Sequence, residues 1–449
     1  MSGEWKDTTL GQICAAQGGA IQTGPFGSQL HTSDYKEFGI PVVMPTNIGD
    51  GGIVVDGIAR IDQADVDRLS QHRLQMGDIV FSRRGDVTKN ALIRQHQVGW
   101  FCGTGCLKVR LGGESIATAK FISHCLRLPD IKDWLIRHAV GATLPNLNTG
   151  ILSAVPICLP PLRVQLEIAA MLGALDDRIA LLRETNATLE AIAQALFKSW
   201  FVDFDPVRAK LEGRAPEGMD EATAALFPDS VEESELGLVP KGWAYATIRE
   251  VVEGVYDGPH ATPPEADSGP VFLGIKNLTG TALDLGEIRH IAEAQWQQWT
   301  RRVEPQGGDI VFSYEATLGF FALIPKGLRC CLGRRLALIR PKTLGGAGHF
   351  WFHQFVAAPF QRLLTKHTIQ GATVNRIALK EFPSYGVLNP PLSLQAEFDK
   401  AVAPLWAKIH ENQSQAQTLA TLRDTLLPRL ISGQLRLPEA ESLLQGVAT

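Results

Sequence analysis

The residues of this chain best suited to chemistry form a basic loop at residues 83–90. Arg83 and Arg84 are adjacent in it, and Lys89 and Asn90 close it. A guanidinium can donate two hydrogen bonds at once to guanine O6 and N7 or to a phosphate, and an asparagine amide can pair with adenine. The loop therefore suits contact with a nucleic acid, although a solvated or acid-paired loop would have the same composition.

Two further groups of polar residues are weaker candidates. One follows the tripeptide Gly-Ala-Thr, at residues 141–143 and again at 371–373, and the other includes the stretch 257–263. Short polar side chains suit phosphates or base edges, but Thr and Asn also stabilise turns. These candidates are Thr143, Asn146, His260, Thr262, Lys276, Thr373, Asn375 and Arg376, and Tyr314 lies in a later segment that corresponds to the basic loop.

Motifs of catalysis and metal binding are missing from the sequence. It contains no GxxxxGK[ST] phosphate loop, no GxSxG and no HExxH. The segment Asn-Pro-Pro-Leu at 389–392 resembles the Asn-Pro-Pro-aromatic motif of DNA amino-methyltransferases, whose ring stacks on a flipped base, but Leu392 replaces the ring. The seven cysteines have no paired zinc-site spacing, so we expect reduced, mostly buried thiols.

The candidates lie in a framework that the chain repeats at an offset of about 230 residues. Gly-Asp-Ile-Val-Phe-Ser at 77–82 returns at 308–313, and Pro-Pro-Leu with a following Gln at 160–165 returns at 390–395. So long a period indicates duplication of a whole domain rather than a solenoid repeat. Between the shared motifs the two copies differ almost completely. We therefore expect one scaffold that serves two different targets.

Each copy is followed by a segment with the pattern of a long helix. Apolar residues recur there at alternating steps of four and three, and a sustained period of 3.5 residues predicts a coiled coil. Because the two helices match, each is the expected partner of the other, and we predict an antiparallel pair. An asparagine interrupts the row of apolar residues, or seam, of each helix. The seam residues are Ile168, Leu172, Leu175, Ile179, Leu182, Asn186 and Leu189 in the first helix, and Phe398, Val402, Leu405, Ile409, Asn412 and Leu419 in the second.

These patterns predict an α+β protein with two duplicated mixed α/β domains and two long helices. We place the domains at 1–160 and 243–390, the helices at 161–200 and 391–430, an acidic linker at 201–242 and a tail at 431–449. Pro428 is expected to end the second helix near Leu427. Helices that pack on their own domains instead are the alternative.

Charge and hydropathy limit the class of protein. The net charge is −4, but residues 201–242 carry 4 basic against 10 acidic residues, which is −6 and more than the whole deficit. Both copies are thus near neutral, which permits DNA binding. The sequence has no run of 18 apolar residues, so it predicts no membrane span. Its polar start lacks the apolar core of a signal peptide, so we expect a cytoplasmic protein without membrane contact.

The arrangement resembles the specificity (S) subunit of a type I restriction-modification enzyme. The duplicated motifs carry the resemblance in order, and Trp-Phe-Val-Asp-Phe-Asp-Pro-Val at 200–207 is also similar to the segment that ends the first helix in that family. It implies two target-recognition domains, each recognising one half of a split, asymmetric site on double-stranded DNA, with the helices setting the gap. The departure from the first copy is Tyr314 and Glu315, which replace its basic pair.

The resemblance also implies partners and a role without catalysis. Two modification subunits would bind S-adenosylmethionine and methylate adenine, and restriction subunits, the motor-nucleases, would use ATP and magnesium. None of these cofactors would bind this chain. The alternatives are a self-contained DNA adenine methyltransferase with fused recognition repeats, and a two-headed DNA-binding regulator.

Overall fold

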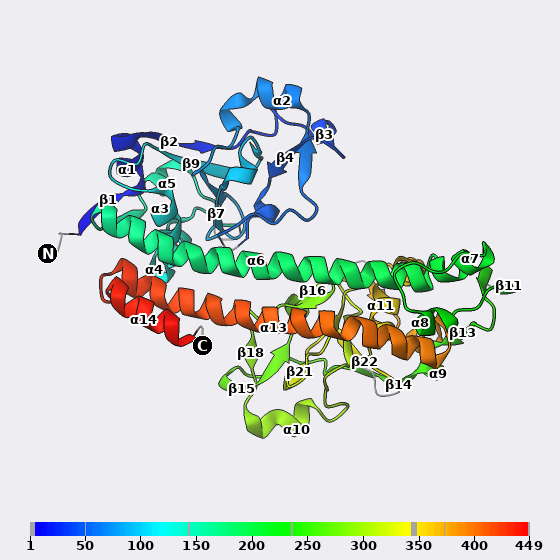
Figure 1. Cartoon of the computed structure of the whole chain (residues 1–449). Helices are drawn as coiled ribbons and strands as arrows, with labels where there is room; N and C mark the ends of the chain where they lie inside the picture. The colour runs from blue at the N-terminus through cyan, green and yellow to red at the C-terminus, as the bar shows by residue number, and fades with distance from the viewer. Residues whose placement is uncertain are drawn as a thin grey trace. The chain divides into compact units, whose positions relative to one another are not determined.

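The structure, a computed structural model, describes residues 5–49, 51–141, 144–234, 237–342, 348–371 and 373–447. Its internal contacts divide the chain into two compact units. Unit 1 contains Met1–Ile179 and Thr418–Thr449, and unit 2 contains Ala180–Gln417. Each long helix contributes one part to each unit (Figure 1).

Unit 1 is built on two four-stranded sheets with the orders β2-β9-β6-β7 and β3-β5-β4-β8. The first sheet is antiparallel, and its two central strands are buried on both faces. The elements of the domain are β1 (Lys6–Thr9), α1 (Leu10–Gln17), β2 (Gly18–Thr23), β3 (Tyr35–Lys36), β4 (Ile40–Val43), β5 (Ala59–Ile61), α2 (Gln63–Arg68), β6 (Ile79–Ser82), β7 (Asn90–Leu92), β8 (Phe101–Cys102), β9 (Cys106–Gly112), α3 (Ala119–Cys125), α4 (Pro129–His138), α5 (Thr149–Ser153) and β10 (Pro156–Leu159).

Unit 2 repeats the first sheet with the order β14-β22-β19-β20. Strand for strand, β14, β22, β19 and β20 match β2, β9, β6 and β7. The elements of this copy are β13 (Ala244–Thr247), α9 (Ile248–Val251), β14 (Val252–Asp257), β15 (Ala266–Leu273), β16 (Leu278–Thr279), β17 (Ala282–Leu283), β18 (Arg289–His290), α10 (Trp296–Trp299), β19 (Ile310–Ser313), β20 (Phe321–Leu323), β21 (Cys330–Leu332), β22 (Leu336–Pro341), α11 (His349–Val356), α12 (Ala358–Lys366), β23 (Thr368–Ile369), β24 (Arg376–Ile377) and β25 (Gly386–Asn389).

The repeated Gly-Asp-Ile-Val-Phe-Ser motif forms the same turn and strand in both sheets. Its glycine has a positive φ, 83° at Gly77 and 92° at Gly308, which a side chain would oppose. The aspartate that follows is buried and pairs with an arginine of the neighbouring strand: Asp78 with Arg110 at 2.6 Å and Asp309 with Arg340 at 2.7 Å. Removing either charge would leave its partner without a counterion, which explains why both members recur.

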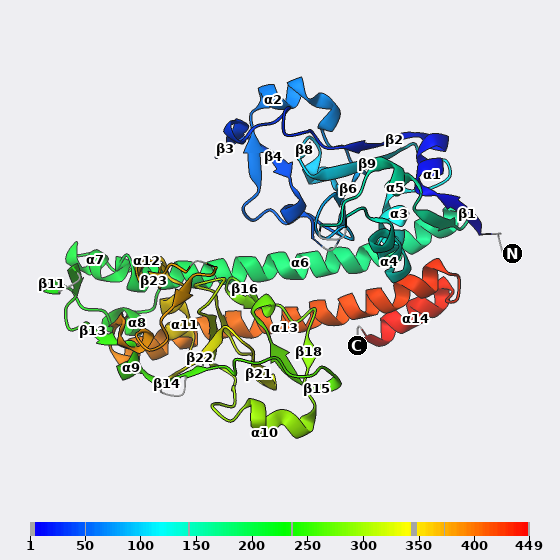
Figure 2. The ribbon, with the colours of Figure 1, turned by 180° about the vertical axis from the view of Figure 1, so that it is seen from behind.

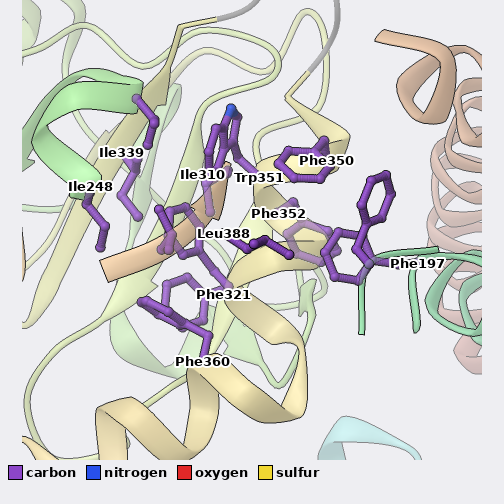
Figure 3. Close-up of a cluster of buried hydrophobic side chains, with 14 of the residues drawn as sticks. Phe197, Ile248, Ile310, Phe321, Ile339, Phe350, Trp351, Phe352, Phe360 and Leu388 are labelled. Atoms are coloured by element: carbon purple, nitrogen blue, oxygen red, sulfur yellow. The ribbon is translucent and has the colours of Figure 1, made fainter. Parts of the chain in front are cut away.

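The acidic segment 201–242 is folded as part of unit 2. It forms α7 (Asp205–Leu211), α8 (Glu221–Ala225) and a hairpin of β11 (Val231–Ser234) and β12 (Gly237–Pro240). Several of its apolar side chains, among them Val207 and Phe227, are buried in the core of the unit. That core is rich in aromatic rings, and Figure 3 shows Phe197 beside Phe350 and Phe352 in it. The rings of Phe197 and Phe350 are 5.6 Å apart.

The two long helices are α6 (Leu162–Phe201) and α13 (Leu392–Ile431), and they lie side by side in both views (Figures 1 and 2). Both start after a Pro-Pro, and a glutamine of the first turn folds back on the chain: Gln165 Nε2 donates to the Pro160 carbonyl at 2.9 Å and Gln395 Nε2 to the Pro390 carbonyl at 2.8 Å. This hydrogen bond accounts for the repeated Gln.

The helices run antiparallel. In unit 2, Asn412 Nδ2 donates to Asn186 Oδ1 at 2.8 Å and Asn186 Nδ2 donates to the Ile409 carbonyl at 3.1 Å, while Phe197, later in α6, meets Phe398, earlier in α13. The asparagines thus satisfy each other inside the seam. The seam residues are buried, apart from the half-buried Asn186, Leu189, Leu405 and Leu419. The predicted fold class, two mixed α/β domains with an antiparallel helix pair, is confirmed.

The two long helices also share a polar contact in unit 1, and the described residues of unit 2 contain no equivalent of it. Asp176 of α6 accepts hydrogen bonds from Arg423 of α13 and from Arg127, each at 2.8 Å. Both arginine side chains are buried, and the Asp176 side chain is 17% exposed. Burial raises the pKa of Asp176, but the two arginines lower it by more, so the net pKa lies below its ordinary value. At the offset of Gln165 and Gln395, the matching residue is Trp406, which donates to His353 Nε2 at 3.1 Å.

The end of the second helix differs from the prediction. α13 continues through Pro428 to Ile431 because Leu426, Leu427, Leu430 and Ile431 are all buried in the core of unit 1, which outweighs one missing amide donor. After it, a further helix, α14 (Leu437–Val447), occupies the segment that we expected to be a tail.

Candidate nucleic-acid interface

In the first copy, three segments meet at the end of the β6 strand. The Arg83 amide donates to the Gly105 carbonyl at 2.9 Å, and the Leu147 amide donates to the Arg83 carbonyl at 2.9 Å. Arg84 and Asn146 form an isolated β-bridge. The basic loop is therefore held between the turn before β9 and the residues that follow the Gly-Ala-Thr motif. Two groups of candidates that are far apart in sequence lie together.

The same three segments meet in the second copy. The Tyr314 amide donates to the Arg335 carbonyl at 3.1 Å, and the Ile377 amide donates to the Tyr314 carbonyl at 2.8 Å. Glu315 and Arg376 form the matching β-bridge. Every backbone contact of the first copy has its counterpart, whereas the side chains at the matched positions differ in charge and shape.

The side chains of the first copy divide into held and free groups. Arg83 Nε donates to Asn146 Oδ1 at 3.2 Å, so the amide orients this guanidinium. Arg84 is exposed, and its side chain has no hydrogen bond or ion pair with the part of the chain that the structure describes. Lys89 is exposed and lies 4.0 Å from Asp86. Thr143 lies outside the described residues.

Asn90, predicted as a DNA contact, does not belong to the candidate surface. It is only 2% exposed, and its amide donates to the carbonyls of Thr88 and Leu126, at 3.3 and 3.4 Å. Asn90 begins β7, whose inward face packs on α3, so the polar group is used to satisfy buried backbone. Its sequence neighbour Lys89 points the other way, as alternate residues do at a strand.

In the second copy, several side chains, candidates among them, contact Asp257. Tyr314 is buried, and its hydroxyl donates to Asp257 Oδ1 at 3.0 Å. His260 Nε2 lies 2.8 Å from Asp257 Oδ2, and Arg302 pairs with the same oxygen at 3.2 Å. Burial, and next the charge of Asp257, raise the pKa of Tyr314, so the phenol stays a donor. Tyr314 thus serves as a support for the surface and not as an exposed contact.

Arg302 is a member of this group that the sequence did not single out. It follows α10 in a stretch without any repeated motif, and it also donates to the Gly258 carbonyl at 3.1 Å. Only its contact with the Asp-Gly-Pro-His segment reveals it. Arg335, by contrast, belongs to the adjacent arginines at 334–335, which stand out in the sequence as a weaker candidate pair.

The remaining candidates of the second copy lie at different places. Arg376 and Thr373 are exposed, and Asn375 is half-buried, with its carbonyl accepting from the Ala316 amide at 3.0 Å. These three belong to the segment beside Glu315. Lys276 pairs with Glu287 at 3.4 Å, and Thr262 is exposed, with no side-chain hydrogen bond to the part of the chain that the structure describes. The structure does not join Lys276 or Thr262 to the Glu315 group.

The described residues contain no group of three His, Cys, Asp or Glu side chains that could hold a metal ion. All seven cysteines are free, and six of them are buried. Burial raises the pKa of the buried thiols, which makes them poor nucleophiles and ligands. None of the helices in the described ranges is long and apolar enough to cross a membrane.

Comparison with known proteins identifies the framework. Residues 2–191 match the family model of the type I restriction modification DNA specificity domain. This part of the chain is similar to a type I specificity domain. The matched region spans the first copy and most of α6, and the second copy repeats its motifs and its strand order. The resemblance to type I specificity subunits expected from the sequence is confirmed.

Several curated relatives are type I specificity subunits. The MjaIX specificity subunit of Methanocaldococcus jannaschii is 24% identical over 72% of this chain and 70% of its own length. The HindI specificity subunit of Haemophilus influenzae is 24% identical over 67% of this chain and 73% of its own. Among solved structures, the type I S subunit from M. genitalium aligns with 95% of this chain and 96% of its own, at 15% identity and a TM-score of 0.49. Specificity subunits are generally non-catalytic.

Proposed function

We propose that this chain is the DNA-recognition subunit of a type I restriction-modification complex. Each copy recognises one half of a bipartite, asymmetric site on double-stranded DNA, and the helix pair sets the gap between the halves. The observation that supports this most directly is the frame of three segments that both copies share. Its backbone hydrogen bonds are the same at Arg83 and Tyr314, while the side chains that it presents differ.

Under this proposal, the partner subunits carry out the catalysis. Two modification subunits would bind S-adenosylmethionine and methylate adenine, and restriction subunits would use ATP and magnesium. The residues that contact DNA are Arg83, Arg84, Lys89 and Asn146 in the first domain, and His260, Arg376, Thr373 and Asn375 in the second. Arg forks suit guanine or phosphate, and amides suit adenine.

The purified chain should transfer no methyl group and bind no S-adenosylmethionine. The reason is the lack of a glycine-rich cofactor loop and the presence of Leu392 where a methyltransferase needs an aromatic ring. Binding is measured by calorimetry, and transfer is measured with labelled cofactor on DNA, with and without the modification subunit. Methylation by the highly purified chain alone would favour the self-contained methyltransferase instead.

Replacing Arg83 and Arg84 together by Ala should relax recognition in one half-site. A bidentate arginine–guanine contact contributes about 1–3 kcal/mol of discrimination. A phosphate contact would instead weaken binding to all sequences and reduce the salt dependence. The measurement is competition between the correct duplex and single-mismatch duplexes for the assembled complex.

The matched control for this variant is Arg137→Ala. Arg137 lies on α4 and is exposed, and within the described ranges its side chain donates to the carbonyl of Asp133 in its own helix and to no other group. Equal affinity of the double variant and the control for every duplex would show that the loop faces solvent in the complex.

A further inference from the structure

The second copy lacks the basic pair of the first, yet it holds a cation at the neighbouring turn. Arg335 occupies the position of Gly105, since the carbonyls of both accept the hydrogen bond from the first residue of the loop: the Arg83 amide at 2.9 Å and the Tyr314 amide at 3.1 Å. The guanidinium has therefore moved from the loop to the turn that faces it.

The backbone at this turn has a conformation that favours glycine. Gly105 has φ of 82° and Gly85, at the tip of the loop, has 79°. Their counterparts are Arg335 at 70° and Ala316 at 68°, so the second copy places side chains where the first uses glycine. A side chain in this region strains the backbone, and such strain persists mainly where it has a use.

Arg335 makes one long ion pair, and its side chain donates no hydrogen bond to the part of the chain that the structure describes. Its Nε lies 3.6 Å from Glu315 Oε1, an ion pair that is longer than a hydrogen bond. This Nε is buried and has no hydrogen-bond partner in the described part of the chain. The side chains of Arg335 and Glu315 are 35% and 29% exposed, so the pair reaches the surface at the junction of the three segments. Glu315 holds the guanidinium in place without using the two N–H groups that would donate to a base.

We propose that Arg335 is the base-recognising cation of the second domain and that it donates to guanine O6 and N7. The assignment rests on the function proposed above. A guanidinium paired with a carboxylate is nearly neutral, so it gains little from the phosphate backbone. Its directional donors still match a guanine edge. Glu315 is then a positioning residue that sets where the guanidinium points.

The test compares Arg335→Gly, Arg335→Lys and Ala316→Gly in the chain assembled with its modification subunits. Arg335→Gly restores the residue of the first copy, so it removes the guanidinium and the strain together. Ala316→Gly removes similar strain without a functional group and is the matched control. Both glycine variants should raise the melting temperature, each by about 2 °C. A stability gain shows that the variant folds.

Methylation-site mapping supplies the functional measurement. With Arg335→Gly, discrimination at one position of the second half-site should fall about tenfold to a hundredfold, while the first half-site stays unchanged. Arg335→Lys should lose the same discrimination because an ammonium lacks the fork, and Ala316→Gly should keep both halves. A strict second half-site in Arg335→Gly would overturn the proposal, as would an equal loss for all sequences with a reduced salt dependence. If the unmodified complex methylates no bipartite site, the proposed function fails first, and this assignment fails with it.

Discussion

A complex with seven additional residues in each long helix should methylate sites whose two halves lie farther apart, with both half-sites unchanged. The seam of α6 and α13 keeps a 3.5-residue period, so a heptad preserves its phase. We would insert it after Ala180 in α6 and after Gln417 in α13, with leucines at both seam positions. Seven residues add about 10 Å at 1.5 Å per residue, which is at most about three base pairs.

The effect is large because the original sites should be lost altogether. Extra twist between the halves must be absorbed by the DNA, so the gain in spacing is an upper limit. Insertions of four residues are the control, since they break the seam phase and should damage assembly. Methylation-site mapping decides the outcome. An active heptad variant that still modifies only the original spacing would show that the helices do not set the gap.

Asp176→Ala should destabilise unit 1 by about 3–5 kcal/mol, toward the lower end of that range. The substitution removes the carboxylate shared by Arg127 and Arg423 while both guanidiniums stay buried, although Arg423 keeps Asp424 at 2.8 Å. Urea unfolding at neutral pH measures the change. The matched control is Asp177→Asn, at the next residue: its carboxylate is 69% exposed and pairs with Arg94, so it should cost at most about 1 kcal/mol.

The same carboxylate gives this prediction a pH dependence. The pKa of Asp176 is lower in the folded protein than in the unfolded chain, so its stabilisation is complete above the unfolded value and is lost as the pH falls below it. Between neutral pH and about pH 4 the stability difference between Asp176→Ala and the unchanged chain should stay constant. Below about pH 4 it should shrink. Equal stability of the two proteins at neutral pH would show that the cluster contributes nothing.

Some features of the fold follow from short-range rules, and these could be predicted. The seam repeats over seven named positions in the first helix and six in the second, so one atypical residue cannot hide it. The Gly-Asp strand motif combines a positive-φ glycine with an aspartate that pairs across the sheet, and both demands are local. The three-segment frame could not be predicted, because the hydrogen bond from Arg83 to Gly105 joins residues that no pattern links.

The predictions that were wrong rest on local signals that contacts distant in sequence override. Pro428 is a local signal for a helix end, but the buried side chains of Leu427 and Leu430 override it. Asn90 has the residue type of a DNA contact, and only its burial beside Leu126 shows that its amide is already used. At Pro428 and Asn90, tertiary packing thus decided against a local rule. The acidic segment 201–242, expected to link the two copies, also packs Val207 and Phe227 into the aromatic core.

The unlike polar contacts of the two long helices also determine which helices can pair. Asp176 gives α6 a mostly buried negative charge, and Arg423 gives α13 a buried positive one. Two copies of α6 side by side would bury two carboxylates without an arginine from the partner helix, and two copies of α13 would bury two guanidiniums. Each arrangement costs several kcal/mol. Although the halves of the chain repeat one design, each long helix is thus selective for the helix of the other half and against a second copy of itself.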